Sequence, residues 1–172
     1  TATYDQVHLT RSMRGWATAG ESFQVWSTPL GRIGMLLGYD ADFPEAPTVL
    51  SRLGADVIVH PTTWRQEWEV ELGVPERASE NHVSLLSAAR IDSPVRRGSL
   101  LMSTFEMPLK FAGELNPVRP VELPAGRENY GLLRIVPAWS RNKQLMENTN
   151  LLGNRRPDLY GPIVAESSLI SS

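Results

Sequence analysis

The chain has 172 residues, a formal net charge of −2 and no cysteine. Its length and its 41% hydrophobic content are those of one globular domain with a substantial core. The weak negative charge predicts no nucleic-acid or membrane partner, and no apolar run is long enough to span a bilayer. Without cysteine, these residues form no disulfide, thiolate metal site or thiol nucleophile.

The first elements predicted are two strands. Residues 23–27 alternate apolar and polar side chains, which is typical of a strand that ends at the turn beginning with Thr28. Residues 33–37 form a short apolar run, which predicts a strand buried on both faces.

A helix is expected after the second strand. Asp42 suits its N-cap, Pro44 its first turn, and Glu45 lies at the spacing of a capping box. Apolar residues then recur at helical spacing, and Gly54 suits the C-terminal end. The strand expected at 57–59 completes a β-α-β unit, which implies parallel pairing and a right-handed crossover.

The second half repeats this unit and then changes in character. A helix is predicted over 75–82 and a strand over 83–89. Beyond Gly98, turn residues separate short apolar runs, which is typical of antiparallel strands. These strands are expected at 99–104, 109–112, 118–123 and 132–136. A last helix is expected from about Trp139 to Glu147, and an extended tail over 157–172. The fold class predicted is α/β with a mixed sheet.

The segment from Gly31 to Glu45 reads GRIGMLLGYDADFPE. It resembles the strand-turn-helix signature of the nitrilase superfamily of carbon–nitrogen hydrolases, in which a cysteine stands between the apolar strand and the Tyr-Asp pair. Glycine stands there in this chain, at position 38. Further segments resemble family elements in the same order: 4–9, 54–61 with Trp64, 77–90 and 154–160.

The resemblance implies a nitrilase-like α-β-β-α sandwich. Residues 1–165 would form the last two-thirds of that domain, with its N-terminal portion missing, and residues 166–172 would be a tail. A partial sandwich leaves apolar surface and strand edges to be covered. We therefore expect a second copy of the chain, a partner chain or a further domain to cover them.

In the family resembled, a cysteine attacks the substrate carbon, a glutamate is the general base and a lysine stabilises the oxyanion. Gly38 occupies the cysteine position and Gln6 the lysine position. The resemblance places the first glutamate before Thr1, and Glu21 is the one candidate for a second. Gly38 also has a structural explanation, because glycine tolerates a tight turn between strand and helix.

We therefore expect a cavity that binds a small amide-like or carboxylate-like molecule, with no cofactor. The residues expected to form it are Gln6, Gly38, Tyr39, His60 and Trp64. No metal site is predicted, because the three histidines are scattered along the chain. For His60 a satisfied histidine at a strand end is the favoured interpretation, and turn formation is favoured for the acidic cluster after Gly38.

Three functional hypotheses follow. The first is a catalytically silent carbon–nitrogen hydrolase-like domain that acts as a ligand-binding, regulatory or assembly module. The second is an amide or nitrile hydrolase whose missing catalytic groups come from an upstream segment or a partner chain. The third is a purely structural subunit of an oligomer. The cytoplasm is the default location for all three.

Overall fold

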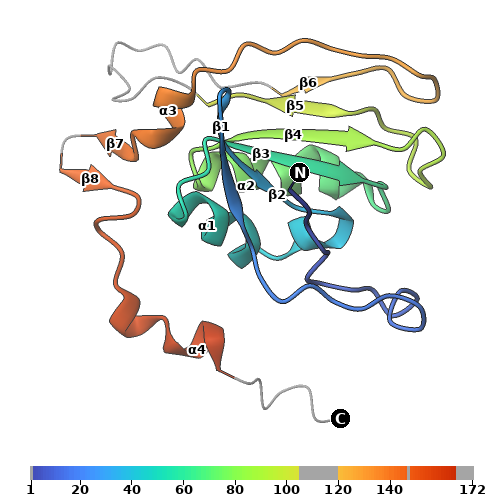
Figure 1. Ribbon diagram of the computed structural model, residues 1–172. Helices are drawn as coiled ribbons and strands as arrows, with labels where there is room; N and C mark the ends of the chain where they lie inside the picture. The colour runs from blue at the N-terminus through green and yellow to red at the C-terminus, as the bar shows by residue number, and fades with distance from the viewer. Residues whose placement is uncertain (1, 105–119, 147, 166–172) are drawn as a thin grey trace.

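The computed structural model describes residues 2–104, 120–146 and 148–165 (Figure 1). The strands are β1 (Val25–Thr28), β2 (Gly31–Met35), β3 (Val57–Thr62), β4 (Ser84–Ala89), β5 (Leu100–Met102), β6 (Val121–Glu122), β7 (Gln144–Met146) and β8 (Thr149–Asn150). The α-helices are α1 (Glu45–Arg52), α2 (Val74–Glu80), α3 (Pro137–Arg141) and α4 (Gly161–Val164). Two 3-10 helices, η1 (Gly38–Asp42) and η3 (Pro157–Leu159), and one π-helical turn, η2 (Glu69–Gly73), complete the set.

One six-stranded sheet has its strands in sequence order, from β1 to β6. The β2–β3 and β3–β4 pairs are parallel, and the β1–β2, β4–β5 and β5–β6 pairs are antiparallel. Both β-α-β units and the antiparallel part beyond Gly98 are therefore confirmed. The carboxyl ends of β2, β3 and β4 lie at the same edge of the sheet, where the cavity described below is found.

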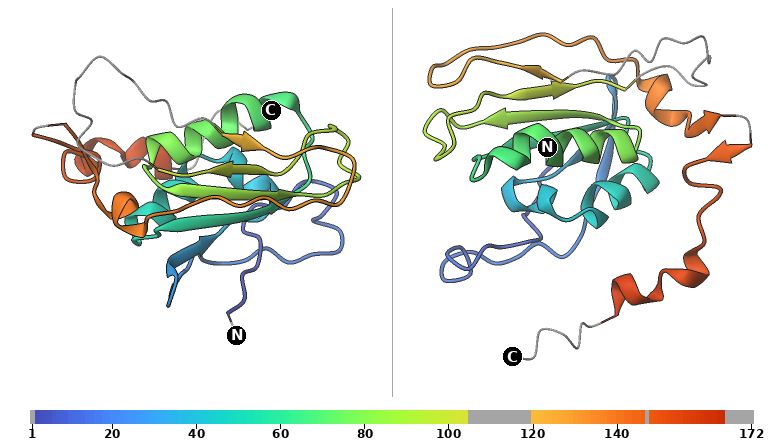
Figure 2. Two further views of the ribbon diagram at one scale, coloured as in Figure 1. Left: turned by 90° about the horizontal axis from the view of Figure 1, so that it is seen from above. Right: turned by 180° about the vertical axis from the view of Figure 1, so that it is seen from behind.

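Helices cover one face of this sheet, and the core lies between the two layers. Figure 2 (left) shows α2 lying along that face, with the N-terminal segment on the other side. Ile58 and Leu85 are paired in register and fully buried, as is Leu50 of α1. A Cβ at Gly34 would lie 3.1 Å from both Leu50 methyl carbons, so glycine allows α1 to approach β2 this closely.

The other face of the sheet carries a row of apolar side chains that are only half buried. Met35, Val59, Leu86 and Leu101 are partners in register across β2 to β5. They point away from the helices, because side chains alternate along each strand. The sheet and its helices thus form two layers of an α/β sandwich.

Asp42 does not cap α1, contrary to expectation. The helix begins at Glu45 after Pro44, and no side-chain hydrogen bond caps it. Asp42 instead ends η1, and its Oδ2 accepts a hydrogen bond from Arg65 Nη2 at 2.7 Å. The Asp42 carboxylate thus binds Arg65, 23 residues further along the chain, instead of capping the helix.

Several other boundaries differ from those predicted. The helical segment before β4 begins at Glu69 rather than Pro75. No strand forms over 132–136, and the expected 139–147 helix is replaced by the short α3 followed by β7. The expected extended tail contains η3 and α4. The strand predicted at 109–112 lies outside the described residues.

Two buried groups hold the segment around α3 against the sheet. The carboxylate of Asp56, fully buried, accepts hydrogen bonds from Arg141 Nε and Nη2, both at 2.8 Å. Lys143 Nζ donates to the carbonyl oxygens of Asn81 at 2.8 Å and His82 at 2.9 Å. Burial lowers the pKa of Lys143 to about 8. In the described part of the chain, no helix has the length and apolarity that crossing a membrane requires.

Candidate functional site

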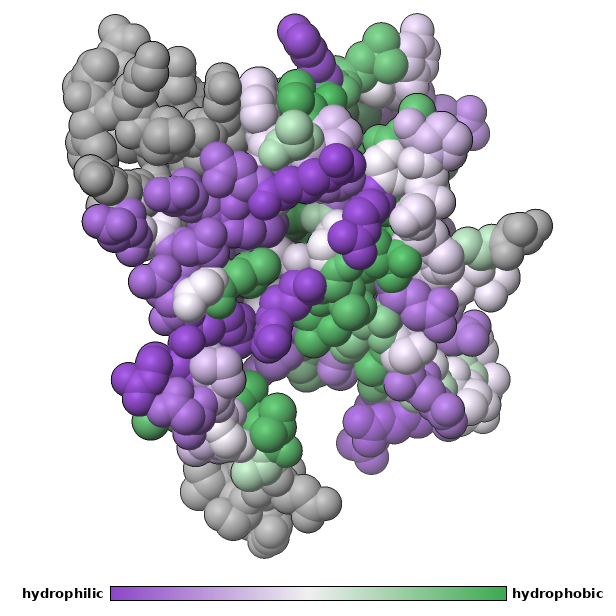
Figure 3. Space-filling model, turned by 60° about the vertical axis from the view of Figure 1, so that its left-hand side comes forward, coloured by the Kyte–Doolittle hydropathy of each residue, from purple (hydrophilic) through white to green (hydrophobic). Residues whose placement is uncertain are grey.

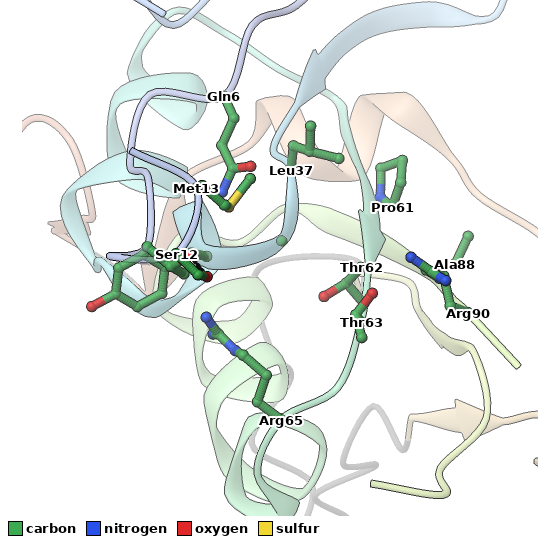
Figure 4. Close-up of a pocket in the computed structure, with 13 residues that line it drawn as sticks. Gln6, Ser12, Met13, Leu37, Pro61, Thr62, Thr63, Arg65, Ala88 and Arg90 are labelled. Atoms are coloured by element: carbon green, nitrogen blue, oxygen red, sulfur yellow. Dashed lines mark hydrogen bonds between the residues drawn. The ribbon is translucent and has the colours of Figure 1, made fainter. Parts of the chain in front are cut away.

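A cavity of about 410 Å³ opens at the carboxyl ends of β3 and β4 (Figure 4). The N-terminal segment contributes Gln6, the turn after β2 contributes Gly38, and the end of β3 contributes Thr62. Arg65 and Arg90 lie just beyond the same strand ends and also line the cavity. In open α/β sheets, ligands bind in the crevice at the carboxyl ends of the strands, which is the edge where this cavity lies.

Gly38 starts the η1 turn with φ of +49°, a left-handed conformation that glycine adopts without strain. A Cβ at this position would project into open space. Its nearest neighbour would be Gln6 Nε2 at 3.8 Å, and apart from the adjoining residues Leu37 and Tyr39 no other described atom would lie within 4 Å. The turn therefore directs whatever side chain stands at position 38 into the cavity, beside the Gln6 amide.

Gln6 is held at the cavity rather than left to move in solvent. The residue is only 7% exposed, and its Nε2 donates to the carbonyl oxygen of His8 at 2.8 Å. The backbone carbonyl oxygen of Gln6 accepts a hydrogen bond from the backbone amide of Gly20 at 2.8 Å. Thr10, Ser12 and Met13, in the loop between Gln6 and Gly20, also line the cavity.

Asp40 joins the N-terminal segment to the turn after β2. Its carboxylate is fully buried and accepts hydrogen bonds from the Tyr4 hydroxyl at 2.7 Å and the Leu37 amide at 3.1 Å. The His8 amide donates to Oδ1 at 2.8 Å, and His8 Nδ1 lies 3.0 Å from the same oxygen. Burial and the Asp40 carboxylate raise the pKa of Tyr4 well above its usual range, so the phenol stays protonated and donates.

His60 lies directly behind the turn and is 1% exposed. Its Nε2 is 3.0 Å from the carbonyl oxygen of Gly38, which can only accept, so we assign the proton to Nε2. Nδ1 then accepts a hydrogen bond from the Ser87 hydroxyl at 3.0 Å. His60 therefore supports the turn from within the core, and its ring does not line the 410 Å³ cavity.

We expect acid to destabilise the protein through His60. Burial lowers its pKa from 6.5, although the bond to Gly38 opposes this. Below pH 6.5 the unfolded state then binds more protons than the folded state, so the free energy of unfolding should fall, by up to about 1.4 kcal/mol per pH unit. Urea denaturation between pH 7.5 and 5 would measure this. In a His60→Gln variant the pH dependence should be shallower, and an unchanged slope would contradict the assignment.

Trp64 belongs to the core rather than to the cavity wall. It is 1% exposed, and its Nε1 donates to the carbonyl oxygen of Gly98 at 2.9 Å. Tyr39, by contrast, lines the cavity, and the guanidinium carbon of Arg65 lies 4.7 Å from the centroid of its ring. This distance is within the range of a cation–π interaction.

Two carboxylates hold the Arg65 guanidinium in place. Its Nη2 lies 2.7 Å from Asp42 Oδ2 and 2.9 Å from Glu69 Oε1. Burial raises the pKa of Asp42, and the charge of Arg65 opposes that rise. Among the described residues no cluster of histidine, aspartate and glutamate could hold a metal ion.

Of the five residues expected to form the cavity, Gln6, Gly38 and Tyr39 line it. His60 and Trp64 lie behind it in the core. Sequence reasoning missed Arg65 as a lining residue. A usable signal was present, because a charged residue that follows a buried strand stands at the edge where sites form.

Comparisons with known proteins agree with this architecture. The profile described as carbon-nitrogen hydrolase matches residues 1–109. A protein named as a probable nitrilase from Schizosaccharomyces pombe is 26% identical over 163 residues, covering 91% of this chain and 56% of that protein. The deaminated glutathione amidase of Homo sapiens is 29% identical over 142 residues, covering 78% of this chain and 39% of that protein.

Solved structures are similar as well. A cysteine-to-alanine mutant of the amidase from Nesterenkonia sp. AN1, in complex with butyramide, aligns with a TM-score of 0.53 and 27% identity. The alignment covers 72% of this chain and 50% of that one. The predicted nitrilase-like α/β fold is thus confirmed. The chain spans about half the length of the curated relatives that match most of it.

Proposed function

Since the chain belongs to the carbon–nitrogen hydrolase family, we propose that its cavity binds a small amide-like or carboxylate-like molecule without converting it. The domain would serve as a ligand-binding or regulatory module. The observation that carries this proposal is the turn at Gly38. It directs position 38 into the cavity, and glycine offers no nucleophile there.

Magnitudes favour a silent site. Loss of a covalent nucleophile typically lowers turnover on the order of a million-fold. At the position assigned to the family lysine, the Gln6 amide supplies a neutral hydrogen bond, which is roughly half as strong as a charged one. Binding has no such requirement, because an amide beside an open turn can still hold a polar ligand.

We expect purified protein to bind simple amides weakly and to hydrolyse none of them. A panel of nitriles, amides and carbamoyl compounds would be assayed for ammonia release, with binding followed by calorimetry. Gln6→Ala should weaken binding about three- to tenfold, the effect of removing roughly one hydrogen bond.

Gln24→Ala is the matched control, because Gln24 is exposed and its side chain bonds only to Ser22 among the described residues. It should bind as the wild type does. Steady hydrolysis that Gln6→Ala abolishes would overturn the silent site. Equal binding by both variants would place the ligand elsewhere.

A working hydrolase is the alternative that the relatives favour, because their names are those of nitrilases and amidases. It would require a general base and a nucleophile from another segment or a partner chain. Ammonia release in the same panel would support it. Such a partner could also cover the half-buried apolar row on the sheet, which runs from Met35 to Leu101.

A structural subunit is the other alternative, and the C-terminal arm (residues 149–165) favours it. The arm extends away from the sheet in Figure 1, and Figure 3 shows apolar side chains on its surface. Leu159, Ile163 and Val164 are 61%, 57% and 87% exposed. Self-association in light scattering, without ligand binding, would favour this alternative.

A further inference from the structure

A second hollow of about 490 Å³ lies next to the cavity beside Gly38. Thr10, Tyr39 and Arg65 line both, so the two lie side by side, and together they are called the depression below. The second hollow is bounded by the loop that follows Thr10. A ligand lying across Tyr39 would therefore have one end beside Gln6 and the other beside this loop.

The charged residues that line the two hollows are all arginines. They are Arg11 and Arg14 from the loop, Arg65 after β3 and Arg90 after β4, and no described lining residue is acidic. Arg90 is neutralised by Asp92, with Nη2 2.6 Å from Oδ2. Neither Arg11 nor Arg14 pairs with a carboxylate among the described residues. The uncompensated positive charge thus lies at the loop end of the depression.

Arg65 joins the two hollows with a fixed guanidinium. Asp42 and Glu69 hold its Nη2, and Glu69 also holds its Nε at 3.0 Å. Nη1 donates to no other described residue. In Figure 4 the guanidinium points toward Ser12, on the side of the cavity away from Ala88. Because two carboxylates already offset its charge, Arg65 contributes donors and orientation more than net charge.

We infer that the ligand carries a carboxylate, which lies against Arg11, Arg14 and Arg65 while its amide end lies against Gln6 and Gly38. This inference rests on the proposed function and specifies its ligand class. Guanidinium groups present paired donors that match the two carboxylate oxygens, and the charge strengthens those hydrogen bonds. A neutral diamide would fill the same space without using the loop arginines.

The experiment compares two probes of equal length, succinamate and succinamide, which differ in one charged end. Binding of each to the purified chain would be measured by calorimetry at low and at high salt. We expect succinamate to bind roughly tenfold more tightly, since two exposed ion contacts contribute modestly each. Added salt should reduce this preference, because it screens exposed charges.

Variants locate the effect on the loop. Arg11→Gln/Arg14→Gln should remove most of the preference for succinamate and leave succinamide binding unchanged. Arg52→Gln/Arg127→Gln changes the net charge equally at exposed positions that line neither hollow, and it should preserve the preference. Equal binding of the two probes, or equal loss in both double variants, would overturn the inference.

Two further measurements distinguish this inference from a general anion site and from the proposed function alone. Acetate and inorganic phosphate would be added as competitors, and competition as strong as that of succinamate would mean a site for free anions, which overturns it. Binding of succinamide with no charge preference would overturn it and leave the proposed function standing. Failure of both probes to bind would overturn both.

Discussion

Asp40→Ala should lower the free energy of unfolding by about 3–5 kcal/mol and abolish ligand binding at the cavity. The carboxylate is fully buried and takes four hydrogen-bonding contacts, from Tyr4, Leu37 and twice from His8. Alanine would leave these partly buried donors without their acceptor, and each donor left unpaired away from water costs about 1–3 kcal/mol. Urea denaturation followed by circular dichroism would measure the loss.

Binding should fail for a geometric reason as well. Asp40 is the residue through which the N-terminal segment is tied to the η1 turn, so its removal releases Gln6 from its position beside Gly38. Asp5→Ala is the control, because Asp5 is exposed and lies in the same segment. It should change stability by less than about 0.5 kcal/mol. A loss below about 1 kcal/mol for Asp40→Ala would contradict this account.

The secondary structure and the parallel strand pairing of the first half of the chain could be predicted from the sequence. Strand periodicity, the helix between β2 and β3 and the parallel units all follow from short-range patterns. The turn at Gly38 could be predicted for the same reason. Glycine adopts the left-handed conformation of a tight turn without strain, and Gly38 stands directly after an apolar strand. Three of the residues expected at the cavity, Gln6, Gly38 and Tyr39, line it, and they lie in the two segments nearest that turn.

What could not be predicted depends on partners distant in the chain. Asp42 suits a helix cap by every local criterion, yet Arg65 binds its carboxylate from beyond the next strand. The same holds for the segment after Val136, where the helix expected from about Trp139 to Glu147 is replaced by the shorter α3 (Pro137–Arg141). Arg141, the last residue of α3, binds the buried Asp56 carboxylate, a contact between residues 85 positions apart. A sequence pattern carries no record of such pairings.

The direction of a side chain at a strand end is equally hard to infer. His60 and Thr62 both point to the helix-covered side of β3, yet only Thr62 lines the 410 Å³ cavity. The alternation along the strand predicts which face of the sheet a side chain is on. It does not predict whether that side chain lies behind the Gly38 turn, in the core, or beyond it, in the cavity. The Nε2 of His60 donates its hydrogen bond to the carbonyl oxygen of Gly38, within the turn itself.

Trp64→Ala should cost about 3–5 kcal/mol of unfolding free energy, the usual cost of removing a buried tryptophan. The side chain is enclosed by the core, and its ring packs edge-on against His60 with centroids 6.1 Å apart. Thermal or urea denaturation would measure the loss. Trp16→Ala, which removes a tryptophan that is 75% exposed, is the control and should change stability by less than about 0.5 kcal/mol.

Trp64→Phe separates packing from hydrogen bonding at the same site. Phenylalanine keeps most of the apolar contact but leaves the Gly98 carbonyl oxygen without its donor, so we expect a smaller loss of about 1–3 kcal/mol. Ligand binding by the folded Phe variant should match that of the wild type, because the ring does not line the 410 Å³ cavity. Weakened binding with unchanged stability would show instead that Trp64 is a wall of the cavity, and would move the site inward toward His60.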